Sequence, residues 1–270
     1  MADIPSGTDF HADEIKLRIG ESGYARVDRR WGGRIGNPPY SRLYYVTDGG
    51  GKITLEDSVV ELEKNKIYLF PTGKSIYNFY SEDMEQLYFH INMFDFEGYD
   101  ILRECNVCCA EPDSAQHFEH VISLYKSNDI TDHLELKQII MSQCLDFMKQ
   151  SNCSIRTKNY SPVVREAVSR IRKSPSVQIN VQRLADELFI SKCALNNRFR
   201  KEIGKSVGQF IDDTVMGEAR YILAIEETPI SKVSERLGFC DQFYFSKKFS
   251  AHFGETPSAF RRHLSVTKKQ

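Results

Sequence analysis

The stretch that decides the fold is Ile230-Ser-Lys-Val-Ser-Glu-Arg-Leu-Gly-Phe239, followed by Cys240-Asp-Gln-Phe-Tyr-Phe-Ser-Lys-Lys-Phe249. A similar stretch lies about fifty residues upstream. The matching pairs are Leu195 with Phe245, Phe199 with Phe249, Ile203 with Phe253, Gly204 with Gly254, Ser206 with Thr256 and Phe210 with Phe260. Each copy predicts a short helix, a tight turn and a second capped helix that ends near a glycine. That order is typical of a helix-turn-helix unit.

Helix start signals recur closely from Ser161 to the end of the chain. The candidate N-caps are Ser161, Asn180, Ser191, Ser206, Ser231, Asp241 and Thr256, and a proline follows the first and the last of them. Gly204 and Gly254 suit the left-handed residue that commonly ends a helix. We therefore expect short helices throughout residues 161–270, preceded by a polar linker over 151–160.

The second helix of each unit is predicted to have one apolar and one polar face. Leu195 and Phe199 point inward in the first unit, as do Phe245 and Phe249 in the second. Asparagine, glutamine and lysine side chains can bond to base edges or phosphates in a major groove. The candidate DNA-binding residues on the opposite faces are Lys192, Cys193, Asn196, Asn197, Arg200, Gln242, Phe243, Ser246 and Lys247. Any exposed helix face is polar, so the duplication is what favours DNA binding.

These motifs resemble the DNA-binding domain of the AraC/XylS family. The resemblance covers residues 161–264, and its most specific part is the second stretch, with Gly-Phe, Tyr-Phe-Ser, a basic pair, Phe, Gly and Thr-Pro. It implies a seven-helix fold in which one long helix, about Val207 to Glu226, joins two recognition helices at 191–202 and 241–252. Phe189, Cys193 and Ala194 depart from the family pattern, so we expect the first turn to be distorted and the first unit to read bases less well.

Composition and charge agree with a regulator that contacts DNA only through its C-terminal domain. The 270-residue chain has a net charge of -1, but residues 161–270 hold an excess of basic side chains and the remainder an excess of acidic ones. No apolar run is long enough for a membrane span, and the N-terminus has no signal-like h-region. We read the seven cysteines as reduced thiols, so the expected location is the cytoplasm.

Residues 24–96 are predicted to form short antiparallel strands. Aromatic and β-branched runs at 42–46, 66–70 and 86–93 are separated by the turn signals 48–51, 63–66, 71–73 and 81–83. The segment resembles, more weakly, the cupin-like effector domain of AraC-type regulators. The fold class is therefore α+β with two domains: a cupin-like β-barrel with a helical dimerisation hairpin over residues 1–150, and the all-α seven-helix bundle over 161–270.

An effector pocket is a hypothesis for the barrel. Aromatic faces and arginine donors suit a polar ring such as a sugar, and the last strand places Tyr88, His90 and Asn92 on one face. The candidate ligand-binding residues are Trp31, Arg34, Arg42, Tyr44, Tyr88 and His90. The alternative is that these side chains only pack the barrel. Because the barrel has a single histidine, a metal-holding cupin enzyme is disfavoured.

Two further patterns lie between the barrel and the linker. Cys105-Asn-Val-Cys108-Cys109, with His117 and His120, superficially resembles a metal or redox cluster, but its spacing matches no ligand pattern, and we predict no metal or other cofactor. Residues 115–150 have helical periodicity, broken near Asp129. These two helices resemble the family's dimerisation element, although their apolar stripes could instead pack only on the barrel.

The sequence therefore predicts a transcription regulator and not an enzyme. Its expected partners are double-stranded DNA, a small-molecule effector, a second copy of the chain and RNA polymerase, with no membrane. Activation is the commoner habit of the resembled family. Two alternatives remain open: a cupin-like metalloenzyme tethered to a DNA-binding module, and a regulator controlled by a protein partner without a small-molecule ligand.

Overall fold

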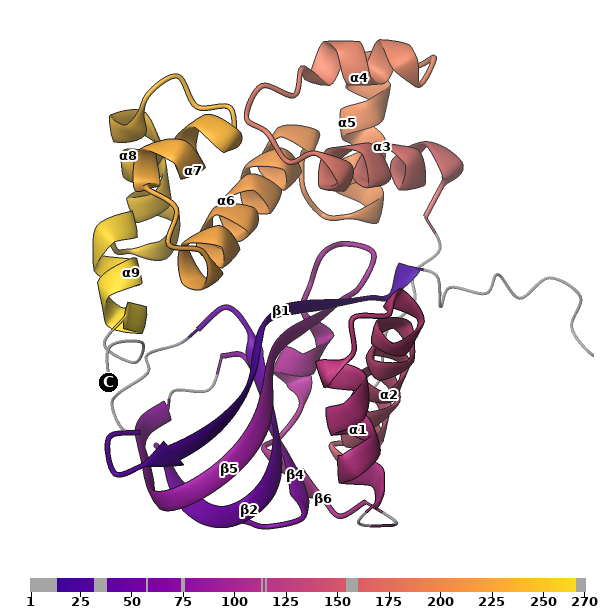
Figure 1. Cartoon of the computed structure of the whole chain (residues 1–270). Coiled ribbons are helices and arrows are strands. Elements are labelled where there is room, and N and C mark those ends of the chain that lie inside the picture. The colour runs from indigo at the N-terminus through magenta and orange to yellow at the C-terminus, as the bar shows by residue number, and fades with distance from the viewer. Residues whose placement is uncertain are drawn as a thin grey trace, which may run out of the picture.

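The computed structural model describes residues 14–31, 38–56, 58–73, 76–112, 114, 116–153 and 160–265. Its first half is a β-sheet with two helices beside it, and its second half is helical (Figure 1). No helix in the described part of the chain is long and apolar enough to cross a membrane. The expected α+β class, with a sheet-rich N-terminal region and a helical C-terminal region, is confirmed at this level.

The sheet is antiparallel and its strands pair in the order β1-β5-β2-β4-β6, with β3 pairing on β2. The strands are β1 Lys16–Asp28, β2 Ser41–Leu55, β3 Val59–Glu63, β4 Lys66–Phe70, β5 Ile76–Phe94 and β6 Cys108–Ala110. Among the described strands no pairing joins β1 to β6. The expected barrel is therefore present only as an open sheet.

Two of the predicted turns are wrong. Residues 48–51 and 81–83 lie inside the long strands β2 and β5. The glycines make β2 bend instead of ending it: the register with β5 shifts between Val46 and Asp48 and again between Gly50 and Lys52. Gly49 has a φ of 64° there, and an added Cβ would lie 2.0 Å from the carbonyl oxygen of Asp83. A bulge of this kind needs a residue without a side chain.

The two faces of the sheet are covered differently. Alternate residues of β5, Leu87, Phe89, Ile91 and Met93, are buried in a cluster that includes side chains of α1 and α2. These helices, α1 Gln116–Lys126 and α2 Ile130–Gln150, are the predicted pair, and Asp129 is the N-cap of the second. The other face carries Tyr40, Tyr44, Phe70 and Phe79 in a second cluster. This inner face holds the candidate ligand-binding residues that the structure describes.

The helical half contains α3 to α9, which match the seven helices that the family resemblance implies. They are α3 Pro162–Lys173, α4 Val181–Glu187, α5 Lys192–Glu202, α6 Val207–Ile225, α7 Ile230–Arg236, α8 Gln242–Phe253 and α9 Pro257–Ser265. Helix α6 runs between the α3–α5 group and the α7–α9 group (Figure 1). Ten of its nineteen residues are buried, so it forms the core to which both groups attach.

Side-chain caps begin most of these helices. The side chains of Asn180, Ser191 and Asp241 accept hydrogen bonds from the backbone of α4, α5 and α8, and Ser206 forms a capping box with Gln209. The prediction for Ser231 is wrong: the N-cap lies two residues earlier, at Pro229, and α7 begins at Ile230. Proline has a fixed φ that suits this position, but Pro229 gives the first turn of α7 no side-chain hydrogen bond.

Candidate nucleic-acid interface

Both helix-turn-helix units make the same left-handed turn. The residue that follows the C-cap of the first helix has a φ of 57° at Phe189 and 81° at Gly238. The expected distortion of the first turn is therefore absent, and Phe189 adopts a conformation that favours glycine. Its side chain is 95% exposed, so the strained backbone is not offset by burial of the ring.

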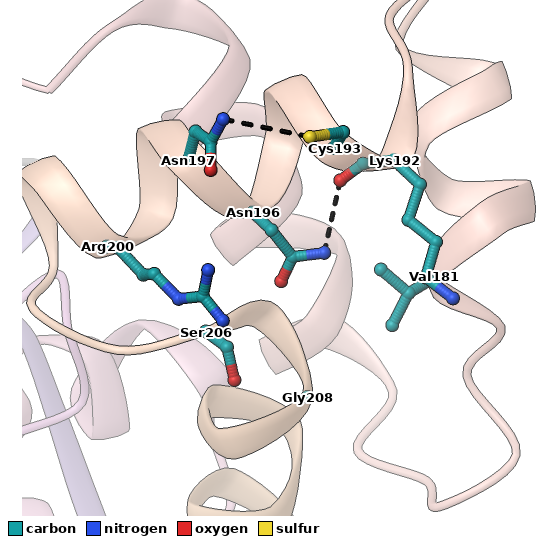
Figure 2. Close-up of a pocket in the computed structure, with 8 residues that line it drawn as sticks. All are labelled: Val181, Lys192, Cys193, Asn196, Asn197, Arg200, Ser206 and Gly208. Atoms are coloured by element: carbon teal, nitrogen blue, oxygen red, sulfur yellow. Dashed lines mark hydrogen bonds between the residues drawn. The ribbon is translucent and has the colours of Figure 1, made fainter.

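The predicted residues of the first recognition helix gather around one shallow concavity of about 700 Å³ (Figure 2). It is lined by Lys192, Cys193, Asn196, Asn197 and Arg200 of α5 together with Val181, Ser206 and Gly208. The last three were missed because they lie on α4 and at the start of α6. Leu195 and Phe199 are fully buried, as the face assignment requires.

Asn196 differs from its neighbours because both ends of its amide are engaged. Its Nδ2 donates to the carbonyl oxygen of Lys192 at 3.1 Å, and its Oδ1 accepts from the backbone N–H of Val207 at 3.2 Å. That N–H belongs to the first turn of α6 and has no partner within the helix. Asn196 therefore fixes α6 against α5. By contrast, Asn197 is exposed and its amide bonds only weakly, to the Cys193 sulfur at 3.7 Å.

The second recognition helix presents a more open face. Gln242, Phe243 and Lys247 are exposed, with Phe243 at 87%, whereas Ser246 is half-buried. Tyr244, which sequence reasoning missed, is 51% exposed, and its ring lies 6.0 Å from that of Phe239. An exposed phenylalanine at the start of a recognition helix can contact a thymine methyl group. α8 thus combines apolar, amide and cationic groups.

The basic pair of α8 is divided between two roles. Lys248 reaches back to Asp212 of α6, with 2.6 Å between Nζ and Oδ1. Lys247 is exposed and forms no ion pair with another described residue. The first therefore anchors α8 to the central helix, and the second stays available for a phosphate.

Comparisons with known proteins agree with this geometry. A family model described as a helix-turn-helix domain matches residues 184–263. The chain is 25% identical to the Msm operon regulatory protein of Streptococcus mutans, over 95% of this chain and 96% of that protein. It is 25% identical to the lactose operon transcription activator of Staphylococcus xylosus, over 85% and 86%. It is 32% identical to the arabinose operon regulatory protein of Escherichia coli, over 36% and 34%.

These matches support the resemblance to the AraC/XylS family of transcription regulators, and the family model places a helix-turn-helix domain in the helical half. The chain is a DNA-binding regulator and not an enzyme, which confirms the two central predictions. The matched domain contains both turns and both recognition helices.

In this regulator, most of the predicted ligand-binding residues lie together on the inner face of the sheet. The ring of Trp31 lies 6.4 Å from that of Tyr44 and 4.9 Å from that of Phe79, and the ring of His90 stacks on Tyr40 at 4.1 Å. Burial raises the pKa of Tyr44 well above its usual value. Arg34 lies outside the described residues.

A carboxylate missed by sequence reasoning joins this group. Glu21 of β1 lies 3.4 Å from Nδ1 of His90 and accepts from the Tyr88 hydroxyl at 3.5 Å. Burial, and then the Glu21 charge, raise the pKa of Tyr88 to about 12. No motif marks Glu21, because its role depends on the pairing of β1 with β5.

The side chains of the predicted cysteine and histidine pattern lie apart and have separate partners. Cys105 lies 3.8 Å from Cys153, sulfur to sulfur, and Cys108 contacts Ser151. The ring of His117 stacks on Tyr45, and His120 pairs with Glu135. Among the described residues, no group of three or more such side chains is placed to hold a metal ion.

Proposed function

We propose that this regulator reads an asymmetric double-stranded DNA site with α5 and α8, and that it activates transcription when a sugar or sugar derivative binds inside a cupin-like N-terminal domain. The domains would follow the predicted boundaries, with residues 1–150 sensing and 161–270 reading DNA. The regulator would act in the cytoplasm, as the sequence predicts.

The observation that carries the effector proposal is the burial of Arg42. Its side chain is 4% exposed and forms no hydrogen bond or ion pair with another described residue. The guanidinium carbon lies 5.2 Å from the centre of the Tyr40 ring and 5.7 Å from that of Phe79. Burying a cation costs several kcal/mol unless hydrogen-bond acceptors surround it. A ligand with hydroxyl or ring oxygens would supply acceptors that the described residues do not offer.

The surroundings of Arg42 favour a polar ring as that ligand. Indole and phenol rings from Trp31, Tyr40 and Tyr44 provide flat faces, and Glu21 with His90 provides further hydrogen-bonding groups. The names of the relatives point the same way, because they regulate Msm, lactose and arabinose operons. One of them is a transcription activator by name, which supports activation here.

The DNA proposal rests on the duplication. Two recognition helices attached to one buried helix, α6, can enter successive major grooves about 34 Å apart. Lys192, Asn197 and Arg200 would act in one groove, and Gln242, Phe243 and Lys247 in the next. The open face of α8 makes it the main reader.

We assign dimerisation to α2. Ile130, Leu134 and Leu145 are exposed, at 68%, 56% and 40%, and their spacing places them on one face of the helix. Met148 is buried, so it belongs to the packing on the sheet and not to a dimer seam. Leu145→Asp should weaken a dimer in light scattering without unfolding the chain, with exposed Glu135→Asp as the control. We propose contact with RNA polymerase only because activation is common in the resembled family.

The effector is tested by calorimetry of the full chain against a panel of mono- and disaccharides. Arg42→Gln keeps a polar side chain and removes its charge, and Arg29→Gln is the control, because Arg29 is a surface residue paired with Glu82. A sugar that binds wild type and the control but not Arg42→Gln supports the proposal. Binding that is insensitive to Arg42→Gln, or no binding of any sugar, would favour control by a protein partner.

The DNA site is tested by selection from a random duplex library with the full chain. A two-part site, one part for each unit, is expected. Substitutions on α8 should relax preference in one part only. A single-part site would contradict reading by both helices.

A further inference from the structure

Two thiols are in contact where α2 ends. Cys105 is buried and is the C-cap of the short helix η2 Ile101–Glu104, and Cys153 is partly exposed and lies three residues after α2. Their sulfur atoms are 3.8 Å apart. The two residues are separated by 48 positions in the sequence, so the sheet and α2 must both be folded to bring these thiols together.

Backbone hydrogen bonds hold both cysteines in place. The N–H of Cys153 donates to the carbonyl oxygen of Met148 at 2.8 Å, which attaches it to α2. Cys105 closes η2, whose N-cap Asp100 accepts from the backbone N–H of Met93 in β5 at 3.1 Å. One thiol is thus attached to the sheet and the other to the helix beside it.

The neighbouring cysteines have other surroundings. Cys108 contacts the Ser151 hydroxyl, with 3.1 Å between sulfur and oxygen, and Cys144 is buried in the cluster between the sheet and its two helices. Among the described residues, no other two cysteine sulfurs are in hydrogen-bonding contact, and no three metal-binding side chains converge. The geometry therefore fits a dithiol pair better than a metal centre.

The two thiols differ in reactivity. Burial, and then Cys153, raise the pKa of Cys105 to about 12, so Cys105 keeps its proton at neutral pH. Oxidants react with thiolates, and the reaction favours exposed sulfurs. Cys153 is the partly exposed member of the pair and is therefore the sulfur that an oxidant reaches first. Cys105 lies in contact with it, in position to attack the oxidised sulfur.

We propose that Cys105 and Cys153 are a redox modification site: hydrogen peroxide joins them in a disulfide, a dithiol reductant separates them again, and the bond alters DNA binding. The thiols are reduced in the resting state, as the sequence predicts for all seven cysteines. In a reducing compartment such a disulfide is transient, which suits a signal rather than a structural staple.

The reaction proceeds in two steps. The Cys153 thiolate attacks one peroxide oxygen, so that an S–O bond forms, the O–O bond breaks and the departing hydroxide takes up a proton to give water. The Cys105 sulfur then attacks the sulfenic acid of Cys153. The S–S bond forms, the S–O bond breaks, and the Cys105 proton leaves with the hydroxyl group as a second water. The two thiols lose two electrons in total, and the peroxide gains them.

The segment that precedes Cys105 also contacts the first helix of the DNA-binding half. Arg172 of α3 donates to the backbone oxygens of Asp95 and Phe96 at 2.6 and 2.9 Å, and the Phe96 ring lies 4.8 Å from that of Tyr160. A disulfide requires sulfurs about 2 Å apart, so oxidation draws the end of α2 and this segment together. The part of the movement that the backbone takes up reaches α3 through these contacts.

The chemical step is tested by treating the full chain with hydrogen peroxide and mapping its peptides by mass spectrometry. The expected product is a peptide pair joined through Cys105 and Cys153, lighter by two hydrogen atoms and separated again by dithiothreitol. Cys153→Ser should lose this product, and Cys105→Ala should leave a sulfenic acid at Cys153 that dimedone labels. Cys240→Ser is the control, because Cys240 is an exposed thiol of the helical half, and it should form the product as wild type does.

The effect on DNA is tested by fluorescence anisotropy with the duplex that library selection identifies. The affinities of the oxidised and reduced chains should differ by about fivefold or more, as is typical of coupled sites. Cys153→Ser, treated alike, should show no such difference. Because this variant keeps the exposed Cys193 and Cys240, it also controls for their oxidation. This measurement rests on the proposed DNA reading and the peptide map does not, so the two can fail separately.

A disulfide found in wild type and in Cys240→Ser, reversed by dithiothreitol and accompanied by the change in affinity, supports the proposal. The proposal is overturned if peroxide oxidises Cys193 and Cys240 while Cys105 and Cys153 stay reduced. It is also overturned if Cys153 pairs with Cys108 instead, or if the disulfide forms and the affinity for DNA is unchanged.

Discussion

The two helix-turn-helix units have the same backbone frame but use their polar side chains differently. Both begin the recognition helix with a side-chain cap, Ser191 in α5 and Asp241 in α8. In α5 the central amide of Asn196 is engaged with the start of α6. In α8 the anchoring task falls to Lys248, which leaves Lys247 exposed. A repeat in sequence therefore preserves the fold and leaves the surface chemistry free to diverge.

The turns diverge in the same way. Gly238 is enclosed, because an added Cβ would lie 2.3 Å from the Ser176 Oγ and 3.1 Å from the Gln178 Cγ. Phe189, in the matching turn, has an exposed side chain and a positive φ. The second turn is thus packed against the α3–α4 connection, whereas the first is open to solvent. A substitution in the turn of the second unit should therefore destabilise the protein more than one in the turn of the first unit.

The largest effect is expected for Gly238→Ala. A left-handed residue with a Cβ costs about 1–2 kcal/mol, and the close contact with Ser176 adds overpacking of about 1 kcal/mol or more. We expect the free energy of unfolding, from denaturant titration, to fall by about 2–4 kcal/mol. Gly204→Ala is the matched control, because its φ is 85° but nothing lies within 4 Å of an added Cβ. Equal losses in the two variants would show that packing at the second turn is unimportant.

Asn196→Ala should have the next largest effect, on stability. It removes the acceptor for the Val207 N–H and leaves a part-buried donor unpaired, which costs about 1–2 kcal/mol. Asn197→Ala should change the free energy of unfolding by less than about 0.5 kcal/mol, as expected for an exposed position. For DNA binding we expect the opposite order: Asn197→Ala should relax sequence preference more than Asn196→Ala does. A relaxed preference in Asn196→Ala at unchanged stability would refute this division.

Lys247→Ala should weaken DNA binding several-fold and reduce the slope of log affinity against log salt by about one unit, because one phosphate contact is lost. Lys248→Ala should leave that slope unchanged, since its charge is held by Asp212. Fluorescence anisotropy over a series of salt concentrations measures both. If the two variants have the same slope of log affinity against log salt, Lys247 and Lys248 do not have the separate roles that the structure indicates.

The repeat and the caps made the helical half predictable from sequence. Asn180, Ser191, Ser206 and Asp241 act locally, within three residues of the N–H groups that they accept from, so spacing alone identifies them. The prediction of Ser231 as an N-cap failed because Pro229, only two residues earlier, also suits a helix start. Local signals cannot choose between two such neighbours.

The sheet was harder to predict, because its features depend on distant partners. The glycines at 49–51 are typical of a turn, and only the pairing of β2 with β5 and β3 makes them a bend inside one strand. The role of Asn196 likewise needs the position of Val207, and that of Glu21 needs the register of β1 on β5. The inner-face residues were predictable as a group because alternation along β5 places Tyr88 and His90 on one side.

The smallest effect is expected at the first turn, and its sign is the opposite of that at the second. Phe189→Gly relieves a left-handed conformation that costs an L-residue about 1–2 kcal/mol, and it loses about 0.5–1 kcal/mol because glycine is more flexible in the unfolded chain. The free energy of unfolding should rise by about 0.5–1 kcal/mol, because the exposed ring contributes little burial. Phe189→Ala keeps the Cβ and should give no such gain. If Phe189→Gly is instead destabilising, the phenyl ring has a packing role, and the two turns are more alike than their exposure indicates.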